Sequence, residues 1–555
     1  MRINYTIRKQ MKIRLLSLLI FVSFSYSSIA QKQNRIPSEK PKLIIGIVID
    51  GMRYDYIYRY WDNFQENGFK KLINEGTFCK NAHYNYLFTQ SNVGYATIST
   101  GAMPSSHGII ANKLYQRSKG KLISCTLDKQ VHCIGSDCEN GNMSPKNLLT
   151  STLSDELNLS NNHKSKIISI SINANDAILS GGHTANAAYW FDKKTGDWVT
   201  SSFYMDTLPN WVVDFNNKKI PDIYLNRQWN PALPVERYSD GNTQGKSKRI
   251  GFYKKSGFPY DLLKLKKKSK TYSVLKNTPF GNTYTKDFAI ATILNENLGK
   301  DNYPDYLTVG FTSTGNISQS CGINSIELED AYVRLDKEIA HFLSFVDENI
   351  GKNNALIFLT SNHGSAYGPQ TLIDKKIPAG YFNSDRAMLL LRTYMNAVYG
   401  SGNWVKAYYN KSIYLNRNLI EDSQLSLKDV QTKVAQFLIQ FSGVANVVTA
   451  STLENTDFSK GIFKKMQNSF NQERSGDVII NLEPAWIEKG DYVTQSNSPY
   501  NYDTHVPLIW YGWKIKRSTL NRKVLINDIA PTIANFLNIS QPNACTGNVI
   551  YDITK

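Results

Sequence analysis

Apolar runs of five to nine residues recur along the chain and are rich in Ile, Val and Leu. They lie at positions 42–50, 166–172, 305–311, 355–359 and 506–512. Runs that are mostly continuous, rather than alternating with polar residues, predict strands buried on both faces of a parallel sheet. Several of them end at or shortly before an Asp, Asn or His, so we expect functional side chains at the strand ends.

Helical periodicity separates these runs. The clearest pattern covers 325–348, where apolar residues recur every three or four positions along one face. These residues are Leu328, Ala331, Leu335, Ile339, Phe342 and Val346. Strands that alternate with helices predict an α/β fold with a mostly parallel central sheet flanked by helices. Ligands of such sheets usually bind beyond the carboxyl ends of the strands.

Two stretches interrupt the alternation. Residues 190–285 are rich in Asn, Lys, Tyr and Pro and predict a loop-rich insertion. Residues 367–500 combine two helical patterns, at 386–400 and 427–441, with short strand-like runs, which predicts a small α+β subdomain. We expect one large domain at 31–555 that carries both insertions.

Residues 1–30 have the pattern of a signal peptide. A basic segment precedes a short apolar one, and small residues end it at Ala30. The apolar segment is shorter than the roughly 20 residues that a membrane span needs. We therefore expect export with cleavage, to the periplasm or cell envelope of a Gram-negative bacterium.

The chain is strongly basic, with a formal net charge of +18 over 555 residues. The leader holds five of the basic residues and no acidic one, so the remainder stays basic. Two lysine-rich stretches, 246–249 and 264–270, lie where we expect solvated loops. Nucleic acid is not favoured as a partner, because no helix-turn-helix, zinc-finger or RNP pattern accompanies the charge.

Six cysteines are too few for a disulfide framework in a chain of this length. In an exported protein, a disulfide among Cys125, Cys133 and Cys138 is plausible. Their spacing does not match a zinc ribbon.

The positions at and shortly after the strand ends should converge in space. They are Asp50, Asn173, Asn175, Gly315, Gln319, Asn362, His363 and His505. A further segment, 88–112, contributes Ser91 ahead of a Thr/Ser-rich turn. We expect that turn to lead into a helix whose N-terminus would favour a phosphate.

These residues and several long strings around them resemble the alkaline phosphatase superfamily, and the PafA-type alkaline phosphatases in particular. The strings include GIVIDGMRYDYIYRYWDNF, ISTGAMPSSHGI, TPFGNTYT, RSGDVII and YDTHVPLIWYGW, in the family's order and over nearly the whole length after the leader. The resemblance implies two zinc ions about 4 Å apart and a Thr or Ser nucleophile that is transiently phosphorylated.

The resemblance carries over to some positions of this chain. Asp50, His363 and His505 fall at zinc-ligand positions, and Ser91 falls at the nucleophile position, where PafA-type enzymes have Thr. Asn112 matches an Asn that contacts the phosphate oxygens of the substrate.

Five other positions depart from the family pattern. Gly315, Gln319 and Asn362 stand where the family has Asp, His and Asp as zinc ligands. Asn173 and Asn175 stand where it has the Lys and Arg that contact the transferred phosphoryl group. Two dications about 4 Å apart repel by on the order of 15 kcal/mol at an effective dielectric near 20. Since Asp50 is the one retained carboxylate of three, we expect no zinc, or at most one weakly bound ion.

The leading hypothesis is a member of this family that has lost phosphomonoesterase activity or retains little of it. It would act as a binding or scaffold protein for an unknown protein partner or a phosphorylated small molecule. The alternative is an active hydrolase of phosphate mono- or diesters that uses Ser91 with one metal or with non-standard ligands. A sulfatase is less favoured, because the residues after Ser91 lack the Pro and Arg of the sulfatase motif.

Each retained residue also has a structural alternative. Asp50 could cap the turn after its strand, and Ser91 could cap a helix, because an unactivated serine is a poor nucleophile. His363 and His505 could each be structural histidines held by hydrogen bonds. The sequence leaves these alternatives open.

Overall fold

A computed structural model describes residues 39–138, 141–239, 257–490 and 492–554. Within this part of the chain, residues 40–554 belong to one compact unit. Its centre is a sheet of eleven strands in which β1 is paired in parallel with β11 on one side and β12 on the other. Ten of the strands follow one another in the spatial order β20 (Ser518–Leu520), β2 (Thr77–His83), β19 (His505–Gly512), β12 (Ala355–Ser361), β1 (Leu43–Ile49), β11 (Asp305–Phe311), β6 (Ile167–Ser171), β7 (Ala187–Phe191), β8 (Trp198–Ser201) and β5 (Cys133–Ile134). The eleventh strand, β21 (Val524–Leu525), pairs with β2.

The predicted α/β class and the mostly parallel centre of the sheet are confirmed. The exceptions are β19, which runs antiparallel to both of its neighbours, and β8, which runs antiparallel to β7. Every residue of β1, β11 and β12 is buried, as their continuous apolar runs predict. An apolar run alone does not specify the direction of a strand, so the reversal of β19 could not be predicted from its residues.

The two faces of the sheet carry separate hydrophobic cores. Odd-numbered residues of β1, such as Ile45 and Ile47, pack with α11 and α13, whereas Ile44 and Val48 pack with α4, α6 and α21. Alternation of side chains across a strand produces this division. The helices are α4 (Ser91–Thr100), α6 (Leu153–Ser160), α11 (Phe280–Asn295), α13 (Ile326–Asn349) and α21 (Ile529–Leu537).

Helix α13 matches its predicted amphipathic pattern. Ser325 caps its N-terminus by accepting a hydrogen bond from the backbone N–H of Leu328, and all six predicted face residues are buried. Glu327 and Glu329 lie in its first turn, where carboxylates stabilise the helix dipole. This helix anchors the sheet face that carries the first core.

The 190–285 region is more regular than a loop-rich insertion. It contributes β8 to the central sheet and contains β9 (Gln228–Trp229), β10 (Tyr260–Asp261), α8 (Asn210–Asn217), α9 (Ile220–Leu225), α10 (Leu262–Ser269) and the 3-10 helix η5 (Tyr272–Asn277). The basic stretch 264–270 was expected in a loop but lies mostly in α10, whose N-cap Asp261 accepts from the backbone N–H of Lys264. The other basic stretch, 246–249, lies outside the described residues.

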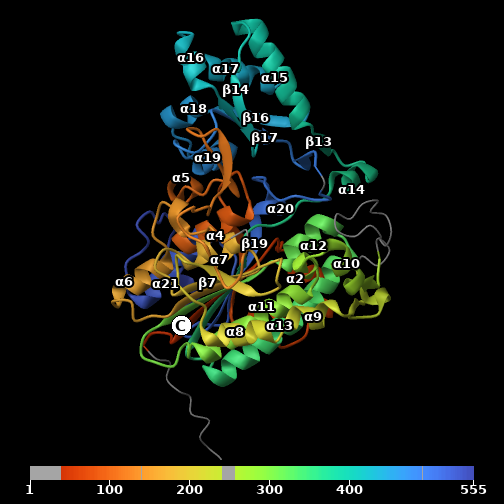
Figure 1. The fold of residues 1–555 in the computed structure, drawn as a ribbon, viewed down its shortest axis with the longest axis vertical. Coiled ribbons are helices and arrows are strands. Elements are labelled where there is room, and N and C mark those ends of the chain that lie inside the picture. Colours follow the sequence, from red (N-terminus) through yellow and green to blue (C-terminus); the bar gives the residue numbers. More distant parts are fainter. Residues whose placement is uncertain (1–38, 139–140, 240–256, 491, 555) are drawn as a thin grey trace, which may run out of the picture. The chain divides into compact units, whose positions relative to one another are not determined.

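The 367–500 region has its own sheet and core. Strands β14 (Val405–Tyr409), β15 (Ser412–Leu415), β17 (Val478–Leu482) and β16 (Val444–Thr449) form a four-stranded sheet in that order. Figure 1 shows helices of the same region beside it, which are α15 (Ser384–Tyr399), α16 (Arg417–Asp422), α17 (Leu427–Leu438), α18 (Ala450–Asn455) and α19 (Gly461–Ser469). Buried side chains of α15, α17 and these strands make a separate hydrophobic cluster. The boundaries of the region as a domain stay a prediction.

Candidate functional site

A cavity of about 360 Å³ lies beyond the carboxyl ends of the central strands. Polar side chains make up much of its lining, and several are positions singled out in the sequence. These are Asp50, Ser91, Asn112, Asn173, Asn175 and Gln319. The structure therefore brings together residues that lie up to 269 positions apart in the chain, as the strand-end argument predicts.

Asp50, Ser91, Asn362 and His363 form a closed group, hereafter the Asp50 cluster. Asp50 follows β1 and Asn362 follows β12, and these strands are paired so that Ile49 stands opposite Ser361. Asn362 donates from Nδ2 to Asp50 Oδ1 over 2.8 Å, and its Oδ1 accepts from the backbone N–H of Gly51. His363 Nε2 lies 3.2 Å from the same Asp50 oxygen. One carboxylate oxygen thus joins the ends of two neighbouring strands.

Ser91 completes this cluster from another element. Its Oγ lies 3.0 Å from His363 Nε2 and 3.4 Å from Asp50 Oδ1. Ser91 is the first residue of α4, and the Thr/Ser-rich stretch expected to precede a helix is instead the last turn of this one. The helix ends at Gly101, whose φ of 65° is left-handed and suits glycine.

His363 is buried, and its two nitrogens have different partners. Nδ1 lies 2.6 Å from the carbonyl oxygen of Gly364, so Nδ1 carries a proton. Nε2 faces Asp50, Ser91 and the hydroxyl of Ser496. Burial alone would lower the pKa of this imidazole, but the hydrogen bond and charge of Asp50 raise it above its usual value. The raised pKa favours an imidazolium that donates to Asp50.

Two expected ligand positions lie on α12 (Ser313–Cys321), the helix after β11. Gly315 packs its backbone against the Asp50 carboxylate, and a Cβ added there would stand 2.3 Å from Asp50 Oδ2. Real Cβ atoms do not approach that closely, so the present position of Asp50 requires glycine here. The side chain of Gln319 lines the cavity and makes no hydrogen bond to the part of the chain that the structure describes.

His505 lies outside this group and is not among the residues that line the cavity, although the strand-end positions are expected to converge. It is the first residue of β19, and its Nε2 lies 2.8 Å from the carbonyl oxygen of Lys80. Its ring is stacked on Tyr54 and His83, with centroids 4.1 and 4.4 Å away. Burial lowers its pKa. These contacts correspond to the structural alternative for His505.

Ser496 is a site residue that the sequence did not reveal. Its Oγ lies 3.3 Å from His363 Nε2, although it stands in an irregular segment nine positions before His505. Nothing in the local pattern distinguishes it from the neighbouring serines. Only the fold of that segment shows which residue meets His363.

Asn112, Asn173, Asn175 and Gln319 line the cavity, and we name them the amide wall. Asn175 accepts at Oδ1 from Ser124 and Thr126, and Asn112 accepts at Oδ1 from the backbone N–H of Asn92. The other amide atom of each, Nδ2, bonds to no described residue. Amide groups offer both donors and acceptors without charge, so this wall suits a ligand with hydroxyl groups.

Asp176 is a second residue that the sequence did not single out, although it directly follows Asn175. It lines the cavity and is 1% exposed, and its Oδ1 has no partner among the described residues. Asn173 donates from Nδ2 to its other oxygen over 3.1 Å. Burial, and after it the charge of Asp50, raises the pKa of Asp176 well above the usual value.

The donors that could hold a metal are few. No group of three or more His, Cys, Asp and Glu side chains suited to a metal occurs in the described part of the chain. Asp50 Oδ1, Ser91 Oγ and His363 Nε2 are separated by 3.0 to 3.4 Å. Ligands about 2.0–2.2 Å from a tetrahedral zinc stand about 3.3–3.6 Å apart, so these three atoms could face one ion. For a second ion, the described residues offer no comparable set of ligands.

The helices of the described residues fall short of the requirements for a membrane span. Among the described residues, no helix combines the length and the apolar composition that crossing a bilayer requires.

Known proteins match this chain over most of its length. It is 37% identical to the alkaline phosphatase PhoV of Synechococcus elongatus, over 98% of this chain and 100% of that one. It is 36% identical to the alkaline phosphatase PafA of Elizabethkingia meningoseptica, over 94% and 96%. A protein of Myroides odoratus named calcium-transporting ATPase is 39% identical over 95% and 97%.

The fold agrees with these similarities. The crystal structure of wild-type PafA superposes with a TM-score of 0.88 and 34% identity, covering 94% of this chain and 100% of that one. The family model for type I phosphodiesterases and nucleotide pyrophosphatases matches residues 44–505. That range contains every residue of the Asp50 cluster and of the amide wall. The chain therefore belongs to the type I phosphodiesterase/nucleotide pyrophosphatase family and has the fold of the PafA alkaline phosphatase.

Proposed function

We propose that this protein has lost phosphomonoesterase activity, or retains little of it, and acts as a binding or scaffold protein. The leader pattern at 1–30 supports export, to the periplasm or cell envelope. The relatives named above are alkaline phosphatases by their names, and this chain shares their fold. The proposal concerns what the substituted site can still do.

The contact between Gly315 and Asp50 carries the proposal. Where the resemblance implies an Asp ligand, the backbone of Gly315 lies against the carboxylate of Asp50, so a side chain there would require that carboxylate to move from its contacts with Asn362 and His363. Two zinc ions about 4 Å apart need several negative ligands to offset a repulsion on the order of 15 kcal/mol. Among the residues that the structure describes, Asp50 is the one carboxylate that contacts both Asn362 and His363. The residues present therefore do not fit a two-zinc centre.

The residues at the substrate-contact positions also support a loss of phosphoryl transfer. Asn173 and Asn175 are neutral, and both are engaged with other side chains, Asn173 with Asp176 and Asn175 with Ser124 and Thr126. Phosphoryl transfer depends on cations that stabilise charge on the transferred group. Neutral amides supply much less of that stabilisation. This loss supports binding without turnover.

A hydrolase with a single metal is the second candidate. The three donor atoms of Asp50, Ser91 and His363 are spaced like one face of a tetrahedral site. A metal held there would supply Lewis-acid activation of an oxygen. This chain would contribute Ser91 as the nucleophile and Asn112 as a donor to the phosphate.

Hydrolysis of p-nitrophenyl phosphate with and without added zinc tests the proposal. The purified chain should show no turnover that depends on Ser91, so wild type and Ser91→Ala should give the same rate. Ser118→Ala, at an exposed serine outside the cavity, is the matched control. Zinc-dependent turnover that disappears only in Ser91→Ala would overturn the proposal and establish the second candidate.

A further inference from the structure

Two lysines line the same cavity as Asp50 and Ser91, and neither has a carboxylate partner in the described part of the chain. Lys276 is half-buried in η5, and Lys193 is exposed in the turn between β7 and β8. The Lys276 and Lys193 side chains make no ion pair or hydrogen bond to the described residues. Burial first, and the neighbouring charge of Lys193 second, lower the pKa of Lys276. A half-buried ammonium beside a second cation is unfavourable unless an anion joins them.

The backbone holds both lysines in place. Tyr272 donates from its backbone N–H to the carbonyl of Lys193 over 2.8 Å, which ties η5 to the β7–β8 turn. Asn316 Nδ2 donates to the carbonyl of Lys276 over 3.2 Å, which ties η5 to α12. The pair therefore stands on elements that are linked to each other and to the helix carrying Gly315 and Gln319.

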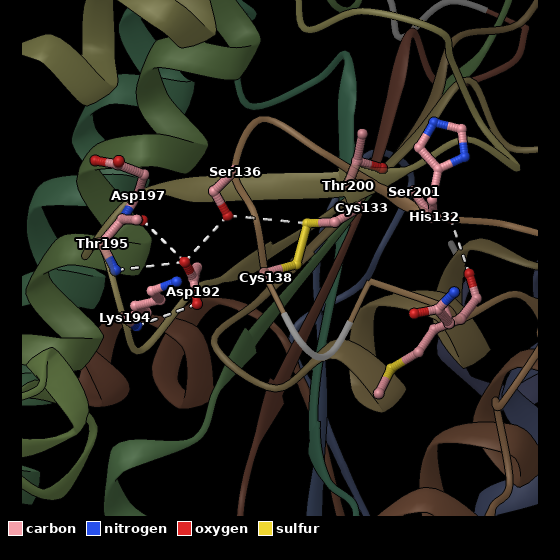
Figure 2. The surroundings of a disulfide bond; sticks show 12 residues. His132, Cys133, Ser136, Cys138, Asp192, Lys194, Thr195, Asp197, Thr200 and Ser201 are labelled. Carbon is pink, nitrogen blue, oxygen red and sulfur yellow. Dashed lines mark hydrogen bonds between the residues drawn. A yellow bond between two sulfur atoms is a disulfide. The ribbon is translucent and has the colours of Figure 1, made fainter.

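A disulfide loop supports the turn that carries Lys193. Figure 2 shows Asp192 at the centre of this arrangement, accepting from Ser136 Oγ and from Thr195 Oγ1, both over 3.0 Å. Ser136 lies in the loop closed by the disulfide between Cys133 and Cys138. Cys138 and Asp192 also line the cavity. Of the cysteines that the sequence offered for a disulfide, Cys125 is thus the free one.

Two buried polar atoms on residues of the cavity lining add a further observation. Oδ1 of Asp176 and Nε1 of Trp190 are buried and have no partner among the described residues. Buried polar groups in proteins are almost always hydrogen-bonded, so orphaned ones at a cavity indicate a missing ligand or water. Together with the amide wall they provide donors and acceptors beside the lysines.

We propose that Lys193 and Lys276 form an anion-binding subsite, and that the cavity binds an acidic sugar-sized molecule. The anionic group, a carboxylate, sulfate or phosphate, would lie between the two ammonium groups. Hydroxyl groups of the ligand would bond to Asn173, Asn175 and Gln319. This ligand class rests on the proposed binding role, because the same molecule would otherwise be a substrate.

Size and charge favour this class of ligand. A volume of about 360 Å³ is at the lower end of the roughly 300–1,000 Å³ of small-molecule sites and suits one or two sugar rings. Neutral amides match hydroxyl groups better than they match a second anion. A single charge is expected, because the carboxylate of Asp50 would repel a second anionic group on its part of the lining.

Isothermal titration calorimetry on the mature chain tests the subsite. The probes are glucose 6-phosphate, glucose 6-sulfate and glucuronic acid, with uncharged glucose as the reference. At least one charged probe should bind at least tenfold more tightly than glucose. Lys276→Gln should weaken that binding at least tenfold, whereas Lys276→Arg should stay within about threefold of wild type, because it retains the charge.

A matched control removes lysine charge outside the cavity. Lys267 and Lys268 are exposed on α10, and the double variant Lys267→Gln/Lys268→Gln should bind as wild type does. Thermal melting of each variant shows that it is folded. If no charged probe binds, if glucose binds equally well, or if Lys276→Gln binds as tightly as the control, the proposal is wrong.

Release of phosphate from glucose 6-phosphate in the same samples separates this proposal from the proposed function. Binding that depends on Lys276 without release supports both. Binding that depends on Lys276 with release that depends on Ser91 keeps the lysine subsite and overturns the proposed function. Absence of both binding and release overturns the subsite alone.

Discussion

Asp50 and Ser91 of the Asp50 cluster line the same cavity as Lys193 and Lys276, but the two groups differ in how their polar atoms are bonded. In the cluster, Asp50 Oδ1 is contacted by Asn362, His363 and Ser91 at 2.8 to 3.4 Å. The ammonium groups of Lys193 and Lys276 contact no described carboxylate. One part of the lining is internally satisfied, and the other lacks partners.

This difference indicates where a ligand gains most. A satisfied network must break existing hydrogen bonds before it can bind something new, whereas unpartnered groups gain bonds without losing any. The positions to which the resemblance assigns chemistry lie in the cluster, whereas the two lysines and Gln319 have side chains that bond to no described residue. Substitutions in the cluster should therefore cost more stability than substitutions at the groups that lack partners.

Gly315→Asp should break the Asp50 cluster most severely. The new Cβ collides with the Asp50 carboxylate and places a second carboxylate beside it in a buried position. We expect a loss of about 3–5 kcal/mol in the free energy of unfolding, measured by urea denaturation with a chelator present. Gly315→Ala introduces the collision without the charge and should cost less. Equal stability of Gly315→Asp and wild type would contradict the close contact.

Asp50→Asn should be the next largest in effect. It removes the charge that partners His363 and exchanges an acceptor for a donor facing Asn362 Nδ2. A loss of about 2–4 kcal/mol is expected, because breaking one side of a buried charged pair leaves the other unpaired. Glu66→Gln, which removes an exposed carboxylate paired with Lys70, should change the stability by less than about 1 kcal/mol. An equally small change in the free energy of unfolding of Asp50→Asn would contradict the contacts of Asp50 with Asn362 and His363.

Asp176→Asn should stabilise the protein, and the gain should depend on pH. The pKa of Asp176 is higher in the folded chain than in the unfolded chain. As pH rises, the unfolded chain therefore loses this proton at a lower pH than the folded chain does. Wild type consequently loses stability as pH rises above the unfolded pKa. Asparagine keeps the shape without that loss. We expect a gain on the order of 1–3 kcal/mol at pH 8 and almost none at pH 3, by urea denaturation at both values. A gain of the same size at both pH values would show that the carboxyl is not the cause.

Two residues of the amide wall, Asn175 and Gln319, should differ slightly in their contribution to stability. Asn175→Ala leaves the hydroxyls of Ser124 and Thr126 without their acceptor and should cost about 1 kcal/mol. Gln319→Ala removes an amide that bonds to no described residue and should change the stability by less than about 0.5 kcal/mol. Differential scanning calorimetry of the two variants makes the comparison. If Gln319→Ala proves the more costly, Gln319 has a structural role that its contacts do not show.

The sequence predicted the sheet well because burial on both faces leaves a continuous apolar run, as in β1 and β12. It predicted α13 because one apolar face recurs over six turns. The start of α4 was not predicted, because its N-cap residue, Gln90, is not a usual capping residue and makes no capping hydrogen bond with its side chain. Helix α10 was also not predicted, although Asp261 there is an ordinary capping residue.

The site was predicted where residues follow buried strands directly and missed where they do not. Asp50, Asn362 and His363 are fixed by strand pairing, which sequence patterns reveal. Ser496 lies in an irregular segment whose path no pattern specifies, so the sequence did not show that it contacts His363. Lys193 and Lys276 meet only through the fold of the 190–285 region. Side chains placed by irregular segments need the structure.

The central claim is that this chain cannot assemble a two-zinc centre. The most direct test is the zinc content of the purified wild-type chain after equilibration with excess zinc and gel filtration, measured by inductively coupled plasma mass spectrometry. Ser91→Ala and Asp50→Asn serve as comparisons, because a single ion facing the cluster would be lost in Asp50→Asn. The account predicts at most one zinc per chain. Two zinc ions per chain would contradict it.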